Sequence, residues 1–385
     1  MQKPRRIIEQ LLSEVGVKIN GPNPWDIQVR DERFYARALK EGSLGLGESY
    51  MEGWWDCARI DEFIYRLLKG NLEEKIRENL RMFLSYLSAR IFNLQSIARA
   101  GIVARRHYNL GNDLFFSFLD PCNQYSCGYF QGTEDLAEAQ RKKLDLICRK
   151  IDLQSRDHIL DIGCGWGGFS RYAAEQYGCT VTAVNISEEQ IRFAREYCQN
   201  LPVSILHEDY RRIRGSFDKI VSVGMFEHVG KKNYRAFMKV VHRCLKEKGI
   251  FLLHTIGGNI SRVNCDSWIN RYIFPNGMLP SITQISRAAE DLFVVEDIQN
   301  LGLHYKKTLL SWNKRFQKAW AGLAGRYDET FKRMWEYYLL SCSGAFSARQ
   351  IQVWQIVMTK AAAVQPRCRF GEEGADAYRS ETTLR

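Results

Sequence analysis

Apolar residues recur with helical spacing in the first quarter of the chain. The first stripe lies on one face of a helix and consists of Ile7, Ile8, Leu11, Leu12 and Val15. A longer stripe with the same period runs from Leu72 to Leu94. We therefore expect residues 1–95 to form a helical N-terminal domain, in which such stripes serve mainly to pack the domain itself.

From about residue 150, short apolar runs alternate with helical segments. The runs that read as strands are 159–162, 181–184, 203–206, 220–223 and 250–255, with two more at 293–295 and 353–357. A basic, aromatic helical insertion at about 306–345 separates the last two. This alternation predicts an α/β fold with a mostly parallel, doubly wound sheet of seven strands and helices on both faces. We assign residues 96–365 to this domain and 366–385 to a disordered or loosely attached tail.

Local signals predict where some helices begin and end. Ser187 followed by Gln190 fits a capping box that opens a helix. Gly249 is expected to stop the helix that begins near Tyr234. No buried strand precedes the first glycine cluster, so we expect a turn between helices there rather than a dinucleotide loop. The cluster comprises Gly42, Gly45 and Gly47.

The composition is that of a globular protein. Of 385 residues, 45% are hydrophobic and 26% are charged, and no apolar run approaches the roughly 20 residues of a membrane span. The first residues lack the apolar core of a secretory signal. The eleven cysteines show no zinc-type spacing. We therefore predict reduced thiols in a cytoplasmic protein and no metal site.

The net charge of +11 favours anionic partners: a phospholipid surface, nucleic acid or acidic metabolites. No acidic residue occurs between Glu78 and Asp113. Five arginines interleaved with apolar residues lie in this stretch, namely Arg81, Arg90, Arg99, Arg105 and Arg106. One hypothesis is that this stretch contacts an anionic membrane. The other is that its apolar residues pack the first domain onto the second.

A glycine-rich loop, Gly163–Gly168, follows the first predicted strand and opens a helix. It is not a phosphate-binding loop, because no Lys-Ser/Thr follows it, and its glycine spacing does not fit the dinucleotide pattern. The acidic residue and glycines at Asp161, Gly163 and Gly165 instead fit the pattern of S-adenosylmethionine-dependent methyltransferases. We therefore expect these three positions to bind the methyl donor.

The second strand ends in Asn185 rather than in the acidic residue that usually holds the donor's ribose. Gln190, at the start of the following helix, is the nearest polar substitute. Asp209 and Tyr210 follow the third strand, where a carboxylate and an aromatic face normally hold the adenine.

Reactive side chains follow the next strands. Glu227 and His228 come after the fourth, at the edge where parallel strands present ligand sites. His254 ends the fifth. Taken alone, His254 and Cys127 read as ordinary buried residues, whereas a buried carboxylate such as Glu227 needs a partner. The Pro-Pro-aromatic run of nucleobase amino methylases is absent here, which counts against a nucleic-acid substrate.

Six runs occur together in one order: HYNLGNDLF, QYSCGYF, LDIGCGWGG, VSVGMFEHVG, LLHTIG and YIFPNGMLPS. The chain thereby resembles the family of cyclopropane-fatty-acyl-phospholipid synthases and mycolic-acid cyclopropane synthases over nearly its whole length. GSLGLGESYMEGWW resembles the bacterial phospholipid-acting branch. The resemblance implies transfer of a methylene from S-adenosylmethionine to the cis double bond of an unsaturated phospholipid acyl chain, with bicarbonate as the base.

The resemblance also implies which residues form the site. The positions that match the anion site, here called catalytic, are Cys127, Glu227, His254, Ile256 and Tyr305. Those that match donor contacts are Tyr125, Ser126, Gly163, Gly165, Asn185, Ile186 and Gln190, with Asp209 and Tyr210. Aromatic candidates for stabilising a carbocation are Tyr125, Tyr129, Phe130, Phe226 and Trp268.

Such an enzyme would be cytoplasmic and peripherally bound to the inner face of the membrane, and the resemblance leaves a homodimer open as its assembly. A related methylase that leaves a methyl branch is the alternative activity. A nucleic-acid methylase and a non-catalytic lipid-binding protein are the competing classes. The complete set of Cys127, Glu227, His254 and Tyr305 argues against loss of catalysis.

Overall fold

The computed structural model describes residues 2–70, 111–262 and 265–370. Seven strands form one sheet in the order β5-β4-β3-β6-β7-β9-β8. They are β3 (His158–Ile162), β4 (Thr180–Asn185), β5 (Val203–His207), β6 (Phe217–Val223), β7 (Leu245–Gly258), β8 (Val294–Asn300) and β9 (Ile351–Thr359). Strands β3 to β7 pair in parallel, and β9 is antiparallel to both its neighbours. The predicted mostly parallel, seven-stranded, doubly wound sheet is confirmed.

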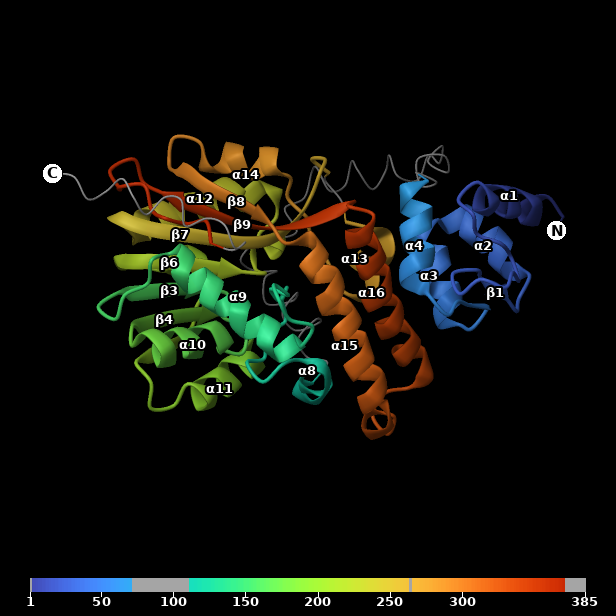
Figure 1. The fold of residues 1–385 in the computed structure, drawn as a ribbon, viewed down its shortest axis with the longest axis horizontal. Helices are drawn as coiled ribbons and strands as arrows, with labels where there is room; N and C mark the ends of the chain where they lie inside the picture. Colours follow the sequence, from blue (N-terminus) through green and yellow to red (C-terminus); the bar gives the residue numbers. More distant parts are fainter. Residues whose placement is uncertain (1, 71–110, 263–264, 371–385) are drawn as a thin grey trace.

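Helices cover both faces of the sheet (Figure 1). One face carries α9 (Leu136–Lys150), α10 (Gly168–Tyr177) and α11 (Glu188–Tyr197), and the other carries α12 (Tyr234–Cys244) and α14 (Ile282–Ala289). Neighbouring strand residues point to opposite faces: Ile159 packs with α9 to α11, and Leu160 packs with α12. Both faces are therefore buried, which explains why these strands read as continuous apolar runs.

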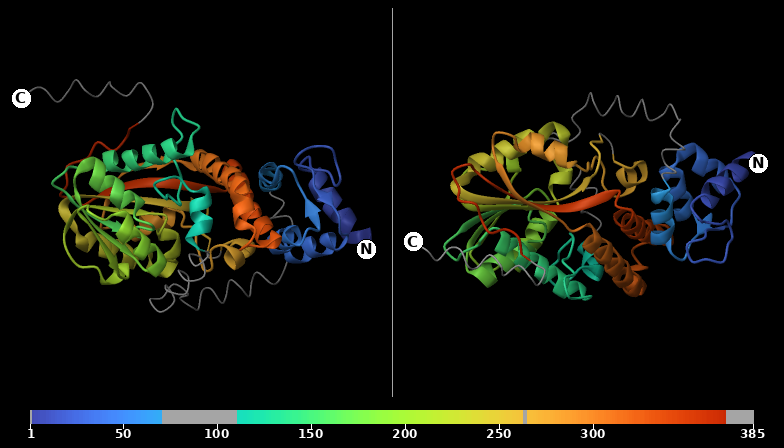
Figure 2. Two further views of the ribbon diagram at one scale, coloured as in Figure 1. Left: turned by 90° about the horizontal axis from the view of Figure 1, so that it is seen from below. Right: turned by 45° about the horizontal axis from the view of Figure 1, so that its top comes forward.

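A helical hairpin is inserted between β8 and β9. It consists of α15 (Gly302–Leu323) and α16 (Glu329–Ser347), which confirms the insertion expected at about 306–345. It begins four residues earlier than expected, so Tyr305 lies within α15. The hairpin lies between the sheet and the N-terminal helices in both Figure 1 and Figure 2.

The described N-terminal part contains α1 (Gln2–Ser13), α2 (Arg33–Glu41), α3 (Ser43–Met51), α4 (Ile60–Lys69) and a small pair of strands, β1 (Gln28–Val29) and β2 (Trp55–Asp56). The expected glycine turn is confirmed only at Gly42, whose φ is +58°. Gly45 and Gly47 lie inside α3. A Cβ at Gly47 would lie 2.4 Å from the ring of Trp268 in α13 (Ser267–Tyr272), so close packing of α3 on α13 requires glycine there.

Polar contacts also join the N-terminal helices to α13 and α16. The Tyr272 hydroxyl donates to Glu48 Oε1 at 2.7 Å. Arg333 of α16 donates to the carbonyls of Tyr50 and Trp55, at 2.5 and 2.9 Å. The predicted stripe from Leu72 to Leu94 and the five arginines lie outside the described residues. No helix in the described ranges is long and apolar enough to cross a membrane.

The structure corrects three local predictions. Ser187 makes no capping bond to α11. The other half of the predicted box is also absent, because the Ser187 N–H donates to Asn185 Oδ1 and Gln190 Oε1 accepts from Asn185. Helix α12 ends at Cys244, before Gly249, because Leu245 already pairs with Phe217 of β6.

The third correction concerns the tail. Residues 366–370 are not loose: Cys368 is buried, and Arg369 donates to Asp297 Oδ1 at 3.1 and 2.5 Å. Residues 371–385 lie outside the described part.

Candidate active site

The glycine loop turns sharply between β3 and α10. Gly163 and Gly165 have φ of +87° and +55°, values that favour glycine. The N–H groups of Gly163 and Cys164 both donate to the Val184 carbonyl, at 2.9 and 3.2 Å, which fixes the loop to β4. A Cβ at Gly165 would have no atom of the described residues within 4 Å. The loop therefore has open space on the side where Gly165 lacks a side chain.

Asn185 ties the end of β4 to this loop. Its Nδ2 donates to the Gly165 carbonyl at 3.1 Å and to Gln190 Oε1 at 2.9 Å, and its Oδ1 accepts from the Ile186 N–H at 2.8 Å. A carboxylate could not donate the first two bonds. Because Gln190 uses Oε1 for Asn185, its Nε2 is the group left to donate to ribose hydroxyls. Asn185 thus acts on the predicted donor site mainly through Gly165 and Gln190.

Three other predicted donor residues already have protein partners. Asp161 accepts from the Ser170 hydroxyl at 2.7 Å, and burial raises its pKa to about 6. Asp209 accepts two bonds from the Arg211 guanidinium, which with the Arg211 N–H keeps its pKa low despite burial. Tyr210 packs its ring on Phe237 at 5.2 Å. Arg211 thus engages both predicted adenine contacts: its guanidinium binds the Asp209 carboxylate and lies over the Tyr210 ring, 5.3 Å from its centre.

Glu227 lies in a short 3₁₀ helix that follows β6. Its Oε1 accepts a 2.6 Å bond from the Ile256 N–H, while Oε2 is buried without a hydrogen-bond partner among the described residues. Burial raises the Glu227 pKa to about 7, and the Ile256 N–H offsets this only in part. Unpartnered buried oxygens are costly. The site is therefore suited to a ligand that donates to Oε2.

His254 lies one strand away from Glu227, in β7 beside β6. Gln355 Nε2 lies 3.3 Å from His254 Nδ1. In this orientation of the amide its nitrogen donates, so Nδ1 accepts and the ring proton is assigned to Nε2. Nε2 is buried without a partner in the described chain, and burial holds the His254 pKa well below its usual value. His254 is thus a neutral N–H donor available to a ligand.

Tyr305 lies near site residues from two other segments, the one that carries Tyr125 and Cys127 and the one that carries Glu227. Burial raises its pKa well above the usual value, and the nearby Tyr125, Cys127 and Glu227 add to this effect. Cys127 is fully buried, and its thiol donates to the Gly128 and Leu301 carbonyls at 3.2 and 3.6 Å. Burial raises the thiol pKa, so Cys127 stays protonated. It therefore lines the site as a neutral side chain and is not a nucleophile.

The five residues predicted to hold an anion therefore come from four separate segments: Cys127 before α9, Glu227 after β6, His254 and Ile256 on β7, and Tyr305 on α15. Two aromatic candidates are absent from this group. Phe226 stacks on Tyr234 at 4.4 Å inside the core. Trp268 packs against Tyr337 at 4.7 Å and beneath Gly47. Tyr125 lies near Tyr305, since both rings pack on Trp312, at 5.2 and 6.0 Å. Tyr129 and Phe130 contact His304 instead.

The structure adds residues that the sequence did not single out. Trp312 stacks on Tyr125 at 5.2 Å, and the Tyr338 hydroxyl shares a hydrogen bond with the Tyr125 hydroxyl at 2.9 Å. Gln140 and Lys143 of α9 hold the segment before it, as described below. One signal was available: Lys143 falls on the apolar face of α9, between Ala139 and Leu146, where a lysine is unusual. The others depend on contacts between distant segments.

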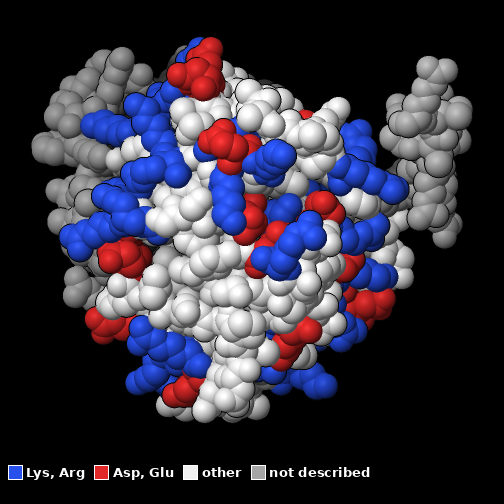
Figure 3. Space-filling view, turned by 90° about the vertical axis from the view of Figure 1, so that its left-hand side faces the viewer, with Lys and Arg blue, Asp and Glu red and all other residues white. Residues whose placement is uncertain are grey.

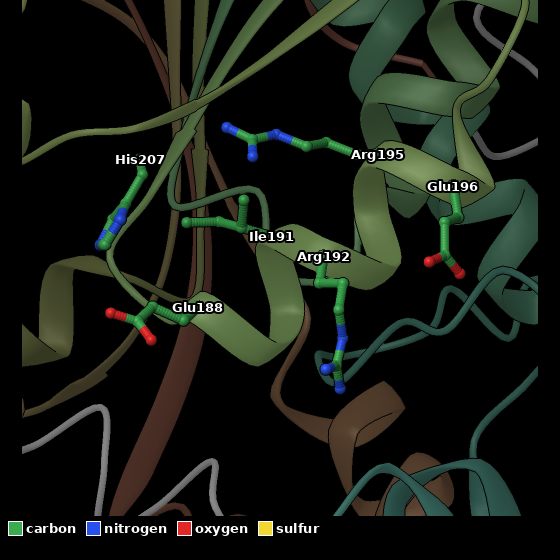
Figure 4. A pocket seen from close by; sticks show the side chains of 6 residues that line it. All are labelled: Glu188, Ile191, Arg192, Arg195, Glu196 and His207. Atoms are coloured by element: carbon green, nitrogen blue, oxygen red, sulfur yellow. The ribbon is translucent and has the colours of Figure 1, made fainter.

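A separate cavity of about 330 Å³ opens beside α11, lined by Glu188, Ile191, Arg192, Arg195, Glu196 and His207. Figure 4 shows that these side chains do not converge: Glu188 and His207 lie together, while Arg192 and Glu196 point elsewhere. None of the predicted site residues lines it. This cavity is therefore a hollow on the flank of the domain and distinct from the predicted site.

Comparisons with known proteins agree with this geometry. The family model described as mycolic acid cyclopropane synthetase matches residues 95–356. The chain is 52% identical, over 92% of its length and 93% of the relative's, to the cyclopropane-fatty-acyl-phospholipid synthase of Escherichia coli. It is 32% identical, over 85% of its length and 81% of the relative's, to the tuberculostearic acid methyltransferase UfaA1 of Mycobacterium tuberculosis.

A solved structure extends the likeness to three dimensions. The mycolic acid cyclopropane synthase CmaA1 complexed with SAH and CTAB is 34% identical, with a TM-score of 0.63, and the match covers 68% of this chain and 98% of that one. The match thus reaches both the sequence and the shape of the catalytic part. This chain belongs to the mycolic acid cyclopropane synthetase family of S-adenosylmethionine-dependent methyltransferases.

Proposed function

We propose that the protein transfers a methylene from S-adenosylmethionine to the cis double bond of an unsaturated phospholipid acyl chain, giving a cyclopropane ring. The observation that carries the proposal is the 52% identity to a cyclopropane-fatty-acyl-phospholipid synthase across both parts of the chain. The buried cluster around Glu227 supports it, because Glu227 Oε2 and His254 Nε2 are buried without a hydrogen-bond partner among the described residues.

The donor fits the glycine loop. S-adenosylmethionine supplies an electrophilic methyl group. Gly165 leaves space for its methionine end, and Gln190 can donate to its ribose. Contacts with Trp312 and Tyr338 fix the orientation of the Tyr125 ring. These contacts position the methyl group against the double bond and exclude water, which is catalysis by orientation.

The anion site fits bicarbonate, which supplies a base when bound. Glu227 Oε2 can accept the bicarbonate hydroxyl proton, and the neutral His254 Nε2–H can donate to another of its oxygens. The Tyr305 hydroxyl and the neutral Cys127 thiol complete the lining of the anion site. A carboxylate beside an anion would otherwise repel it, so the hydroxyl proton shared with Glu227 is what makes the pair stable.

Ring formation on the acyl chain makes two carbon–carbon bonds to the transferred carbon. The alkene π pair forms a bond to the methyl carbon as the sulfur–carbon bond breaks, and the neighbouring carbon becomes a cation. The base then removes a proton from the new methyl group, and that C–H pair closes the ring. Tyr125, stacked with Trp312, presents an aromatic face that can stabilise the cation.

A methyl-branched product is the second candidate, favoured by the match to the tuberculostearic acid methyltransferase. Incubation with S-adenosylmethionine, bicarbonate and unsaturated phospholipid vesicles tests both. Loss of a proton from the same cation gives either the ring or an unsaturated branched chain, and these two products have the same mass, whereas a saturated branch would need a separate hydride donor. Proton NMR of the recovered acyl chains distinguishes a ring methylene from a vinylic methylene. A vinylic signal without a ring signal would replace the ring-forming proposal by the branching one, and unchanged acyl chains would refute both.

The acyl chain lies inside a bilayer, so we also propose that the protein sits on an anionic membrane surface on the cytoplasmic side, with residues 1–95 and 96–365 as its two domains. The charge of +11 supports this. Over the face in Figure 3, basic and acidic side chains are intermixed rather than forming one basic field. This face is therefore a poor candidate for the membrane contact.

A further inference from the structure

Helix α9 holds the segment 124–127 with two buried side chains. Lys143 is fully buried, and its ammonium donates to Gln124 Oε1 and, at 3.0 Å, to Ser126 Oγ. Gln140, one turn earlier and also fully buried, donates to the Ser126 carbonyl at 2.7 Å. This segment carries Tyr125, Ser126 and Cys127, so α9 fixes three predicted site residues at once.

Among the described residues, the hydrogen-bond partners of the Lys143 ammonium are the neutral oxygens of Gln124 and Ser126. Asp120 and Asp161 are close enough to raise its pKa, but both have other partners. Asp120 accepts the N–H groups of Cys122 and Gln124, at 2.8 and 2.9 Å, and Asp161 accepts from Ser170. A buried cation bonded to neutral oxygens is expensive unless an anion compensates it. Its position therefore calls for a functional explanation.

The donor provides an anion at this place. The methionine end of S-adenosylmethionine carries a carboxylate, and the loop expected to receive that end begins two residues after Asp161. Ser126 Oγ accepts from Lys143, so the hydroxyl proton of Ser126 is free to donate to a ligand. In this arrangement the Lys143 ammonium donates to the Ser126 hydroxyl, and the hydroxyl donates to the donor's carboxylate. The positive charge of Lys143 would strengthen the second hydrogen bond.

We propose that Lys143 is a positioning residue for the methyl donor, which orients the Ser126 hydroxyl and supplies the buried positive charge that recognises the donor's carboxylate. This proposal rests on the proposed function, because it requires that Ser126 meets the methyl donor.

The same helix offers a matched control. Lys150 lies seven residues later, is also fully buried, and has an ammonium without a hydrogen-bond partner among the described residues. Its nearest carboxylate oxygen is Asp297 Oδ2, at 4.0 Å. Burial lowers the pKa of both lysines to about 8. Lys150→Met therefore removes a comparable buried charge away from segment 124–127.

Calorimetric titration tests the proposal with two ligands, S-adenosylhomocysteine and its decarboxylated analogue, which keeps the amine. In Lys143→Met, the affinity for S-adenosylhomocysteine should fall about tenfold or more, as expected for a lost charge-assisted contact. The affinity for the decarboxylated analogue should change less than about twofold, and Lys150→Met should change neither. Thermal unfolding confirms that each variant is folded.

Two results would overturn the proposal: unchanged affinities in Lys143→Met, or an equal loss of both ligands, which would mean that Lys143 only orders the segment. If wild type binds neither ligand, the donor site itself is misassigned and the fault lies with the proposed function.

Wild type alone gives a second test that does not depend on the variant folding. The preference for S-adenosylhomocysteine over the decarboxylated analogue should fall as pH rises through about 8, where Lys143 loses its proton. The charged or titratable groups that face Lys143 are Asp120, Cys122, Cys127, Asp161 and His254. A preference that stays constant to about pH 9 would contradict the assignment.

Discussion

The backbone N–H of Ile256 donates to Glu227 Oε1 at 2.6 Å and leaves Oε2 buried without a partner in the described part of the chain. The Thr255 hydroxyl donates to the Ile256 carbonyl at 3.1 Å, and its effect in lowering the Glu227 pKa is smaller than that of the Ile256 N–H. One oxygen of the carboxylate therefore fixes its orientation, and the other remains for a ligand. The next two predictions follow from this division.

Glu227→Gln should lose most of the methylene-transfer activity, because an amide cannot accept a proton as a carboxylate does. Affinity for S-adenosylhomocysteine should change little. In wild type, activity should fall as pH drops through about 7, where Glu227 becomes protonated. Product formation measured by mass spectrometry checks both effects. Glu336→Gln, which changes another partly buried glutamate on α16, should retain activity. Near-normal turnover of Glu227→Gln, whether bicarbonate is depleted or added, would refute this role.

The same substitution should stabilise the protein at high pH. The folded pKa of Glu227 lies above its ordinary value of 4.5, so the folded state binds the proton more tightly. The stability from this group is complete below about pH 4.5 and is lost as pH rises through about 7. Above that pH, Glu227→Gln should unfold with a free energy up to about 3 kcal/mol higher than wild type. Denaturant unfolding at about pH 5 and pH 8 tests whether this gap grows with pH.

Gly165→Val should abolish donor binding while the fold survives, because the new side chain would enter the open space beside the loop. The positive φ of Gly165 adds backbone strain to any such variant. Gly178→Val controls for that strain, since Gly178 has a φ of +68° and ends α10 away from the loop. Calorimetric titration with S-adenosylhomocysteine should show loss of binding in the first variant only. Unchanged affinity in a folded Gly165→Val protein would show that the donor lies elsewhere.

A four-arginine variant tests the membrane hypothesis. Changing Arg90, Arg99, Arg105 and Arg106 to glutamine should weaken sedimentation with phosphatidylglycerol vesicles, at about 1 kcal/mol per arginine and less at high salt. The control changes four exposed arginines of the described catalytic domain, namely Arg141, Arg156, Arg192 and Arg287. Equal binding and equal salt dependence in wild type and the first variant would place the contact elsewhere, in the first sixty residues or on α15.

The sheet could be predicted from the sequence because strands buried on both faces are largely apolar, as at 159–162 and 220–223, where Asp161 and Ser222 are the polar exceptions. The extent of β7 could not, since Leu245 joins the strand by pairing with Phe217 rather than by its own pattern. Gly47 was misplaced for a similar reason: its position in α3 is decided by contact with Trp268, which outweighs the low helix propensity of glycine.

The same limit applies to the candidate site. The spacing of Asp161, Gly163 and Gly165 indicated a donor loop without any structure. The resemblance supplied Glu227, His254 and Tyr305, but no local pattern shows that they meet. Partners such as Gln355 and Lys143 are fixed only when distant segments pack together, and a single sequence does not record such pairs.

The α15–α16 hairpin leaves and re-enters the sheet at one point. The Leu301 N–H donates to the Val353 carbonyl at 2.8 Å, and Asn300 pairs with Trp354, so entry and exit are bonded to each other. An insertion closed in this way can lengthen, shorten or be exchanged without shifting the register of β8 and β9. The hairpin also supplies Tyr305, Trp312 and Tyr338. Changes within this one continuous segment can therefore alter the residues that face the acyl chain, while the glycine loop that binds the methyl donor stays the same.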